Sequence, residues 1–233
     1  MLWSQALQAH FGAAGPQLVL LDLDGTLIDS VPDLTTAVDT MLAGLNRPAA
    51  GAENVSHWIG NGADRLIRRA LCDGDEAAAL ALPTAAVQPA RALFDTAYLQ
   101  ALHQATGAYP GVAEFLQRLQ QAGVPMVLIT NKPRLFTLPL LESLGWLPCF
   151  AQVLCADDLA EQKPSPLPLL HACAQQQVAP AQTLMIGDSR NDMQAAKAAA
   201  VACAAVTYGY NHGADIAASA PDWAVDNLLQ LLA

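Results

Sequence analysis

Charged side chains are scarce in this sequence: they make up 14% of its 233 residues, and only 11 residues are lysine or arginine. The 21 acidic residues outnumber these bases and give a formal net charge of −10 at pH 7. A surface with this excess of negative charge repels phosphate polyanions, so we expect the protein not to bind nucleic acid or an anionic membrane. An anionic small molecule would need a local positive site.

Cysteine is also scarce, and the five thiols are scattered along the chain. They are Cys72, Cys149, Cys155, Cys173 and Cys203. None is placed to form a C-x-x-C pair, and none has a histidine at the spacing of a zinc site. We therefore expect free thiols in a reducing cytoplasm rather than disulfides or a bound zinc ion.

Long apolar runs are missing as well. No run is long enough to span a bilayer, and the first residues lack the basic start and unbroken apolar stretch of a secretory signal. The sequence thus predicts a cytoplasmic protein without a membrane partner. Residues 1–15 are instead expected to form an N-terminal extension, an amphipathic helix that docks on the body of the protein or on a partner. Its expected docking face comprises Leu2, Trp3, Ala6, Leu7 and His10.

What the chain does contain is an apolar strand, a helical stretch and then a regular alternation. After the strand "LVLL", residues 31–107 show helical periodicity and no convincing strand. Ser30 is available as the N-cap of the first helix, with Pro32 in its first turn. An alanine-rich stretch broken by Pro83 and Pro89 is expected to precede a further helix.

From residue 108 onward, apolar strands alternate with helices. We expect helices at 112–121, 134–144 and 191–200 and after "KPSP", and strands at "PMVLIT", "FAQVLC", "TLMIG" and "VACAAVTYG". Continuously apolar strands alternating with helices predict a parallel sheet that is covered on both faces. The predicted fold class is α/β: a Rossmann-like, doubly wound core from residues 16–30 and 108–233, with an all-helical cap inserted at 31–107.

Polar residues follow four of these strands, where each strand ends. They are Asp22 and Asp24 after "LVLL", Thr130 and Asn131 after "PMVLI", Lys163 after "FAQVLC", and Asp188 and Asp192 after "TLMI". Ligands of doubly wound sheets bind at the carboxyl ends of the strands. The sequence therefore predicts that these side chains surround one crevice.

Simpler explanations exist for each motif alone. "DLDG" lacks the glycine position and the later glutamate of a calcium loop. "GDS" could be a plain helix cap, Thr130 another cap, and Lys163 a solvated surface charge. Their occurrence together, in order along one sheet, favours a shared site.

The motifs "DLDGT", "LITN", "KPSP" and "GDSRND", in this order, resemble those of the haloacid dehalogenase-like hydrolases, which are mostly phosphatases. The resemblance spans nearly the whole chain. Within that family, "DSVPDLTTAVDTML", "WIGNGADRLIRRAL", "YPGV", "TNKP" and "VTYGYNHG" are similar to segments of the bacterial phosphoglycolate phosphatases. The implied activity is hydrolysis of 2-phosphoglycolate, a small phosphate ester, by a phosphoric monoester hydrolase.

The resemblance also implies roles for the acidic residues. Asp22 is expected to attack phosphorus and form an aspartyl phosphate, and Asp24 to act as general acid and base. The implied cofactor is Mg²⁺, with the Asp22 carboxylate, the Asp24 backbone carbonyl and the Asp188 carboxylate as ligands. Asp192 is expected to orient Asp188 or to pair with Lys163.

The remaining positions are expected to bind the substrate. Lys163, Thr130 and the backbone amide of Asn131 would contact the phosphoryl oxygens. In the cap, Asn61, the backbone around Gly60 to Gly62, or Arg65 would bind the substrate carboxylate. Lys132, on the core side, is a second candidate for that carboxylate.

Rival functions can be weighed on single residues. A dehalogenase has no need for Asp24, and a phosphonate hydrolase of this family needs a cap lysine, whereas the lysines here are Lys132, Lys163 and Lys197. A sugar phosphomutase, or a phosphatase for amino-sugar phosphates or pyrophosphate, remains open. A non-enzymatic binding module is disfavoured because all the acidic motif residues are present. A monomer and a small homo-oligomer both remain open.

One position departs from the pattern of the resemblance. Ala200 stands where the sequence "AKAAG" commonly ends the helix after the last motif. Because glycine caps a helix end well, we expect its absence to lower local stability rather than catalysis.

Overall fold

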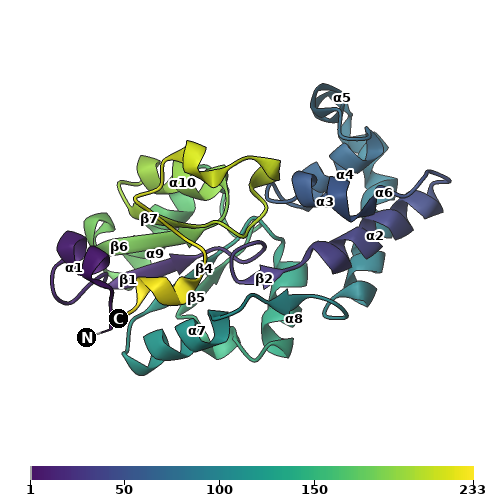
Figure 1. Cartoon of the computed structure of the whole chain (residues 1–233). Helices are drawn as coiled ribbons and strands as arrows, with labels where there is room; N and C mark the ends of the chain where they lie inside the picture. Colours follow the sequence, from purple (N-terminus) through teal and green to yellow (C-terminus); the bar gives the residue numbers. More distant parts are fainter. Residues whose placement is uncertain (1) are drawn as a thin grey trace.

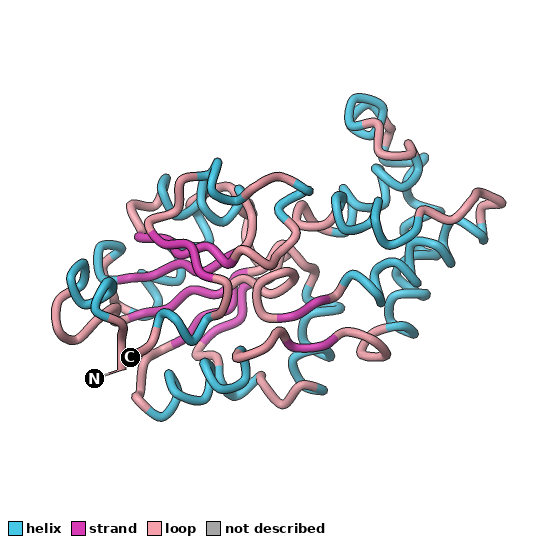
Figure 2. The backbone as a smooth tube through the Cα atoms, in the orientation of Figure 1, coloured by secondary structure: helices cyan, strands magenta, loops and turns pink. Residues whose placement is uncertain are grey.

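The computed structural model describes residues 2–233, and Met1 of the predicted extension lies outside the described residues. Six parallel strands form one sheet in the order β5-β4-β1-β6-β7-β8, beside a separate group of helices (Figures 1 and 2). The strands are β1 (Leu18–Leu21), β4 (Met126–Ile129), β5 (Gln152–Leu154), β6 (Thr183–Gly187), β7 (Ala202–Val206) and β8 (Trp223–Val225). The predicted α/β class with a doubly wound parallel sheet is confirmed.

Helices cover both faces of this sheet. They are α1 (Gln5–Phe11), α7 (Val112–Gln121), α8 (Arg134–Ser143), α9 (Leu167–Gln176) and α10 (Arg190–Ala198). In β1, Leu18 and Leu20 pack in a cluster with α9 and α10, whereas Val19 and Leu21 pack in a second cluster with α1, α7 and α8. Successive strand side chains point to opposite faces, so an unbroken apolar run is what a sheet buried on both faces requires.

The N-terminal segment docks on the body of the protein. Trp3, Leu7 and Phe11 are buried in the cluster beneath α7, and the Ser4 amide donates to the Leu231 carbonyl at 3.0 Å. The predicted docking face was partly wrong, because Ala6 and His10 are exposed. The helix starts only at Gln5, so Trp3 precedes it and does not follow its periodicity.

A block of helices lies between two short strands, β2 (Ile28–Asp29) and β3 (Gly107–Ala108). Its helices are α2 (Val31–Gly44), α3 (Gly51–Trp58), α4 (Ala63–Leu71), α5 (Glu76–Ala81) and α6 (Thr84–Ala101). All of them except α5 contribute to a hydrophobic cluster of their own, which Phe136 of α8 joins from the core. β2 and β3 pair in antiparallel fashion, so the two chain segments that enter and leave the block lie side by side.

Two details of the helical block differ from the sequence prediction. Pro89 does not interrupt a helix, because α6 continues through it and buries Val87 and Ala90 on either side. Ser30 occupies the N-cap position of α2, but its side chain makes no capping hydrogen bond. The Asp29 carboxylate accepts from the Val31 amide at 3.1 Å instead and supplies the missing acceptor.

No helix among residues 2–233 combines the length and the apolar character needed to cross a membrane.

The end of α10 has the geometry of a glycine cap although alanine stands there. Ala200 has a φ of +54°, in the left-handed region. Its amide donates to the Lys197 carbonyl at 3.1 Å, and the Val201 amide donates to the Ala196 carbonyl at 2.9 Å. This pair of bonds is the Schellman motif, in which the left-handed residue is usually glycine because a Cβ is strained there.

We expect Ala200→Gly to raise the free energy of unfolding by about 1 kcal/mol, because it removes the Cβ strain at a left-handed position. The midpoint of thermal unfolding should rise by about 2–4 °C. The matched control is Ala199→Gly, whose φ is an ordinary −88° and which should destabilise the protein instead. A decrease in stability for Ala200→Gly would contradict this explanation.

Candidate active site

The predicted polar residues meet at one edge of the sheet. β5, β4, β1 and β6 are consecutive neighbours, and all run in parallel. Asp22 follows β1 and Asp188 follows β6, while Thr130 follows β4 and Lys163 lies in the loop after β5. All four side chains are buried. The structure therefore brings together residues that are up to 166 positions apart in the sequence.

The Lys163 ammonium connects several residues of this group. Its ammonium lies 2.7 Å from the Asp22 Oδ1, 2.7 Å from the Asp192 Oδ1 and 2.7 Å from the Ile129 carbonyl oxygen. An ammonium has three donors, so each of them has a protein oxygen within reach. Burial alone lowers the pKa of Lys163, but the charges of Asp192 and Asp22 outweigh this effect and raise the pKa above its usual value.

Asp192 is held in place from both sides. Its Oδ2 accepts from the Ser189 amide at 3.1 Å and from the Ser189 hydroxyl at 2.7 Å, which forms a capping box at the start of α10. Its Oδ1 faces Lys163, so both carboxylate oxygens are engaged by protein groups. Of the two predicted roles, the structure shows the pairing with Lys163.

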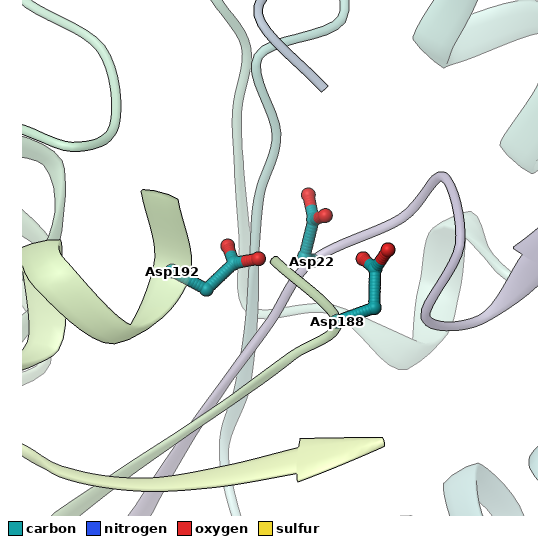
Figure 3. A group of neighbouring side chains, drawn as sticks. All are labelled: Asp22, Asp188 and Asp192. Atoms are coloured by element: carbon teal, nitrogen blue, oxygen red, sulfur yellow. The ribbon is translucent and has the colours of Figure 1, made fainter. Parts of the chain in front are cut away.

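Three carboxylates lie close enough to hold a cation. One oxygen each of Asp22, Asp188 and Asp192 lies within 4.8 Å of the others. Figure 3 shows that Asp22 and Asp188 point to the same side, while Asp192 reaches towards them from α10. Asp188 accepts single bonds from the Thr26 hydroxyl, at 2.9 Å, and from the Tyr210 amide, at 2.8 Å. Asp22 and Asp188 thus keep acceptor capacity for a hard divalent cation, whereas Asp192 serves mainly Lys163 and Ser189.

Burial and mutual repulsion shift the titration of these acids. Burial raises the pKa of Asp188 to about 7, and the nearby charge of Asp192 contributes to the increase. Burial also raises the pKa of Asp22 well above its usual value; Lys163 opposes this shift, and the charges of Asp192 and Asp188 add to it. Both shifts express one fact, that several carboxylates share a site with too little positive charge. A bound divalent cation would offset this excess of negative charge.

A glycine turn places Asp24 beside these residues. Gly25 has a φ of +88°, and a Cβ at this position would lie 2.3 Å from the Asp188 Oδ2. Only glycine fits there. The Asp24 carboxylate lines the same cavity as Asp22, and its two oxygens lie 3.0 and 3.2 Å from the Lys132 ammonium.

The cavity at this edge is lined by both the core and the helical block. Its core side is mostly polar and includes Asp22, Asp24, Thr130, Asn131, Lys132, Lys163 and Ser189. The lining from the helical block is mostly apolar: Leu34, Ile59, Gly60, Gly62, Ala63, Leu66, Phe94 and Tyr98. A ligand in the cavity would therefore contact charged and polar groups on one side and aliphatic and aromatic groups on the other.

Two predicted substrate-binding residues face a different cleft. Asn61 and Arg65 line a neighbouring cleft that does not contain Asp22. The Asn61 Oδ1 accepts from Arg69 at 2.9 Å, and Arg65 pairs with Glu76 at 2.6 Å. The structure does not bring these two side chains to the cavity with the acidic residues, although the backbone of the same loop, at Gly60 and Gly62, does line it.

Sequence reasoning missed the hydrogen bonds that join the two parts of the site. The Gly60 carbonyl accepts from the Asn191 side chain at 3.1 Å and from the Asn131 side chain at 3.0 Å. Asn131 also donates to the Lys163 carbonyl, at 2.9 Å. Asn191 lies within "GDSRND", but only the aspartates of that motif suggested chemistry. Tyr98 was hidden in the apolar periodicity of its helix, although it contacts Lys132.

Buried carboxylates at the carboxyl edge of a doubly wound sheet, covered by a block of helices, are typical of an α/β enzyme whose active site is built from acidic residues. Residues 16–200 match the family described as haloacid dehalogenase-like hydrolase. The chain belongs to this family of hydrolases.

Relatives and solved structures agree with this assignment. The chain is 49% identical to "Phosphoglycolate phosphatase 1" of Pseudomonas aeruginosa, with 97% of this chain and 82% of the relative covered. It is 44% identical to a phosphoglycolate phosphatase of Nitrosococcus oceani, covering 93% and 95% of the two chains. The crystal structure of a predicted phosphoglycolate phosphatase from Haemophilus somnus 129pt superposes with a TM-score of 0.85, at 37% identity over 91% of this chain and 94% of that one.

We expect the binding of a divalent cation to weaken as the pH falls below about 7, because Asp188 then holds a proton that the cation must displace. With Mg²⁺ as the probe, the dissociation constant should rise at least about tenfold per pH unit below that value, because the raised pKa of Asp22 adds to the effect of Asp188. Calorimetry at pH 6 and pH 8.5, in buffers of different ionisation enthalpy, measures the affinity and the protons released. Glu114→Gln, which removes an exposed acid on α7, is the control. Equal affinity at both pH values would contradict this expectation.

Proposed function

We propose that this chain is a Mg²⁺-dependent phosphatase that hydrolyses 2-phosphoglycolate to glycolate and phosphate. The observation that carries the proposal is its similarity, over 97% and 93% of its length, to two proteins named phosphoglycolate phosphatase. The buried acidic cavity supports a phosphoryl-transfer reaction, since it combines a carboxylate nucleophile, a second carboxyl group and hydrogen-bond donors.

Asp22 is the proposed nucleophile. One of its oxygens would form a bond to phosphorus while the bond from phosphorus to the glycolate oxygen breaks, which gives an aspartyl phosphate. Attack requires an ionised carboxylate, but burial favours the protonated form of Asp22. The contact with Lys163 at 2.7 Å opposes that effect and is therefore needed to keep the nucleophile charged.

Asp24 is the proposed general acid and base. It would donate a proton to the leaving glycolate oxygen and then take a proton from the water that hydrolyses the aspartyl phosphate. The turn at Gly25 supports this role, because it directs the Asp24 carboxylate into the cavity that contains Asp22.

Thr130, the Asn131 backbone amide and Lys163 are proposed to bind the phosphoryl oxygens. Lys163 can do so only by releasing one of its three oxygen contacts. The Ile129 carbonyl is the neutral one of the three, so its bond is the weakest to exchange for an anionic phosphoryl oxygen.

The proposed magnesium ligands are the Asp22 carboxylate, the Asp24 backbone carbonyl and the Asp188 carboxylate. Bound there, Mg²⁺ would offset the negative charge that the phosphate ester adds to the carboxylates. Asp192 would act through Lys163, as its contacts indicate.

We divide the chain into a catalytic core, residues 16–30 and 108–233, and a helical cap, residues 31–107. The cap's separate hydrophobic cluster and the paired strands β2 and β3 at its base support this division. The cap would exclude water from the reaction. We place the enzyme in the cytoplasm as a monomer or small homo-oligomer; its free cysteines are consistent with a reducing compartment.

A substrate screen with and without Mg²⁺ tests the proposal. We expect Mg²⁺-dependent release of phosphate from 2-phosphoglycolate to exceed release from an amino-sugar phosphate or pyrophosphate, with no isomerisation of glucose 1-phosphate. Asp22→Asn is the matched control: it should lower kcat by about 1,000-fold or more with unchanged thermal stability. Normal turnover by Asp22→Asn would exclude Asp22 as the nucleophile, and preference for another ester would exclude the proposed substrate.

Asp24→Asn should lower turnover of 2-phosphoglycolate by about 100- to 10,000-fold, since it removes the proton donor for the leaving oxygen. With p-nitrophenyl phosphate, whose leaving group needs no proton, we expect a burst of about one equivalent of nitrophenolate followed by slow release. Rapid mixing measures the burst, and mass spectrometry of the acid-quenched protein detects the trapped aspartyl phosphate. Steady turnover of both esters at the wild-type rate would show that Asp24 is not the acid and base.

A further inference from the structure

The cavity has two buried lysines, and they differ in how their charge is balanced. Lys163 faces two carboxylates and a carbonyl oxygen. Lys132, only 5% exposed, faces a single carboxylate, that of Asp24. Its remaining polar contact is the Tyr98 hydroxyl, which is neutral. Lys132 thus faces fewer carboxylates than Lys163 does, and of the two ammonium groups it is the one that a second anionic group would approach with less repulsion.

Tyr98 adds a hydroxyl donor beside that ammonium. It is only 1% exposed and lines the cavity from α6. Because an ammonium can only donate, the Tyr98 oxygen must accept the hydrogen bond from Lys132. Its own O–H is then left to donate, and no hydrogen-bond acceptor for it is found among residues 2–233. Burial raises the pKa of Tyr98 to about 12, so this proton stays on the phenol at neutral pH.

No other side chain of the helical block offers polarity in the cavity, within the described residues. Its remaining lining side chains are Leu34, Ile59, Ala63, Leu66 and Phe94. Phe136 of α8 adds a further apolar wall, with its ring 4.8 Å from that of Tyr98. The hydroxyl groups of a sugar would remain unpaired against these walls, which is unfavourable. A small ligand with one compact anionic group fits this lining better.

Asp24 fixes where that anionic group must lie. If Asp24 protonates the leaving oxygen, that oxygen lies at its carboxyl group. In a 2-phosphooxy carboxylic acid, a single carbon atom separates the leaving oxygen from the carboxylate. The Lys132 ammonium, 3.0 and 3.2 Å from the Asp24 oxygens, is therefore within reach of both Asp24 and the substrate carboxylate.

We infer that Lys132 and Tyr98 together bind the carboxylate of a 2-phosphooxy acid, and that one ammonium is shared between this carboxylate and Asp24. This inference rests on the proposed function and names the residues that would make the enzyme specific for a substrate carboxylate. The two residues come from opposite sides of the cavity, Tyr98 from the helical block and Lys132 from the core. The carboxylate site is complete only when the block covers the core, so recognition of the acid and closure of the cavity are a single event.

The test compares two esters that differ only in the group under study. Ethyl phosphate has a methyl group where 2-phosphoglycolate has its carboxylate. For the wild-type enzyme we expect kcat/KM to favour 2-phosphoglycolate. Tyr98→Phe should lower kcat/KM for 2-phosphoglycolate by about 10- to 100-fold, the loss expected for a hydrogen bond to a charged group, and leave ethyl phosphate within about threefold.

Lys132→Met should abolish the preference between the two esters, even where it also slows both through Asp24. The ratio of the two kcat/KM values is the readout, because a role confined to positioning Asp24 would lower both values equally. Lys197→Met, at an exposed lysine that contacts the Ser219 carbonyl, is the matched control and should keep the wild-type ratio. Thermal melts verify that each variant is folded, and Tyr98→Phe tests the inference alone if Lys132→Met does not fold.

Equal losses on both esters in Tyr98→Phe and Lys132→Met would overturn the inference while leaving the proposed phosphatase intact. A wild-type enzyme with no preference for 2-phosphoglycolate over ethyl phosphate would overturn the proposed substrate, and the inference with it. A loss confined to 2-phosphoglycolate supports both.

Discussion

Repulsion among buried carboxylates is the constraint on which the rest of this structure depends. Asp22, Asp188 and Asp192 have oxygens within 4.8 Å of one another, and Lys163 is the one ammonium among residues 2–233 that contacts two of them. Ionising all three would leave an uncompensated negative charge in a buried site, which is costly. The raised pKa of Asp188, caused by burial and by the charge of Asp192, expresses that cost. Positive charge near these carboxylates would therefore be stabilising, and the surrounding fold keeps the carboxylates close together.

Several elements of the fold hold the carboxylates in place. Asp22 and Asp188 end two hydrogen-bonded neighbours of one sheet, so their separation is fixed by the spacing of parallel strands. Asp192 is fixed by the capping box with Ser189, which also satisfies the first turn of α10. Gly25 leaves Asp188 the room that any Cβ would occupy. Backbone geometry, rather than a chain of side-chain contacts, therefore sets most of the distances in the site.

The sequence was informative where chemistry and periodicity coincide. Apolar runs that end in polar residues identified β1, β4 and β6 and the edge where Asp22, Thr130 and Asp188 meet.

The sequence was uninformative where side-chain orientation or packing between distant segments determines which residues meet. The backbone of the loop around Gly60 lines the cavity, yet the Asn61 side chain turns away to Arg69. Tyr98 and Lys132 meet across 34 positions, through packing that no local pattern encodes. β2 and β3, with two residues each, are too short to show alternation.

The loop that joins α3 to α4 is attached to the core through hydrogen bonds to its main chain. Asn131 and Asn191 of the core both bind the Gly60 carbonyl oxygen, an atom that every residue type possesses. Side chains elsewhere in this loop can therefore be exchanged over evolutionary time without loosening its attachment. The positive φ angles of Gly60, +105°, and of Gly62, +84°, are restrictions that remain. A loop anchored in this way lets a lineage of enzymes remodel what lies above the reaction centre while the centre itself stays undisturbed.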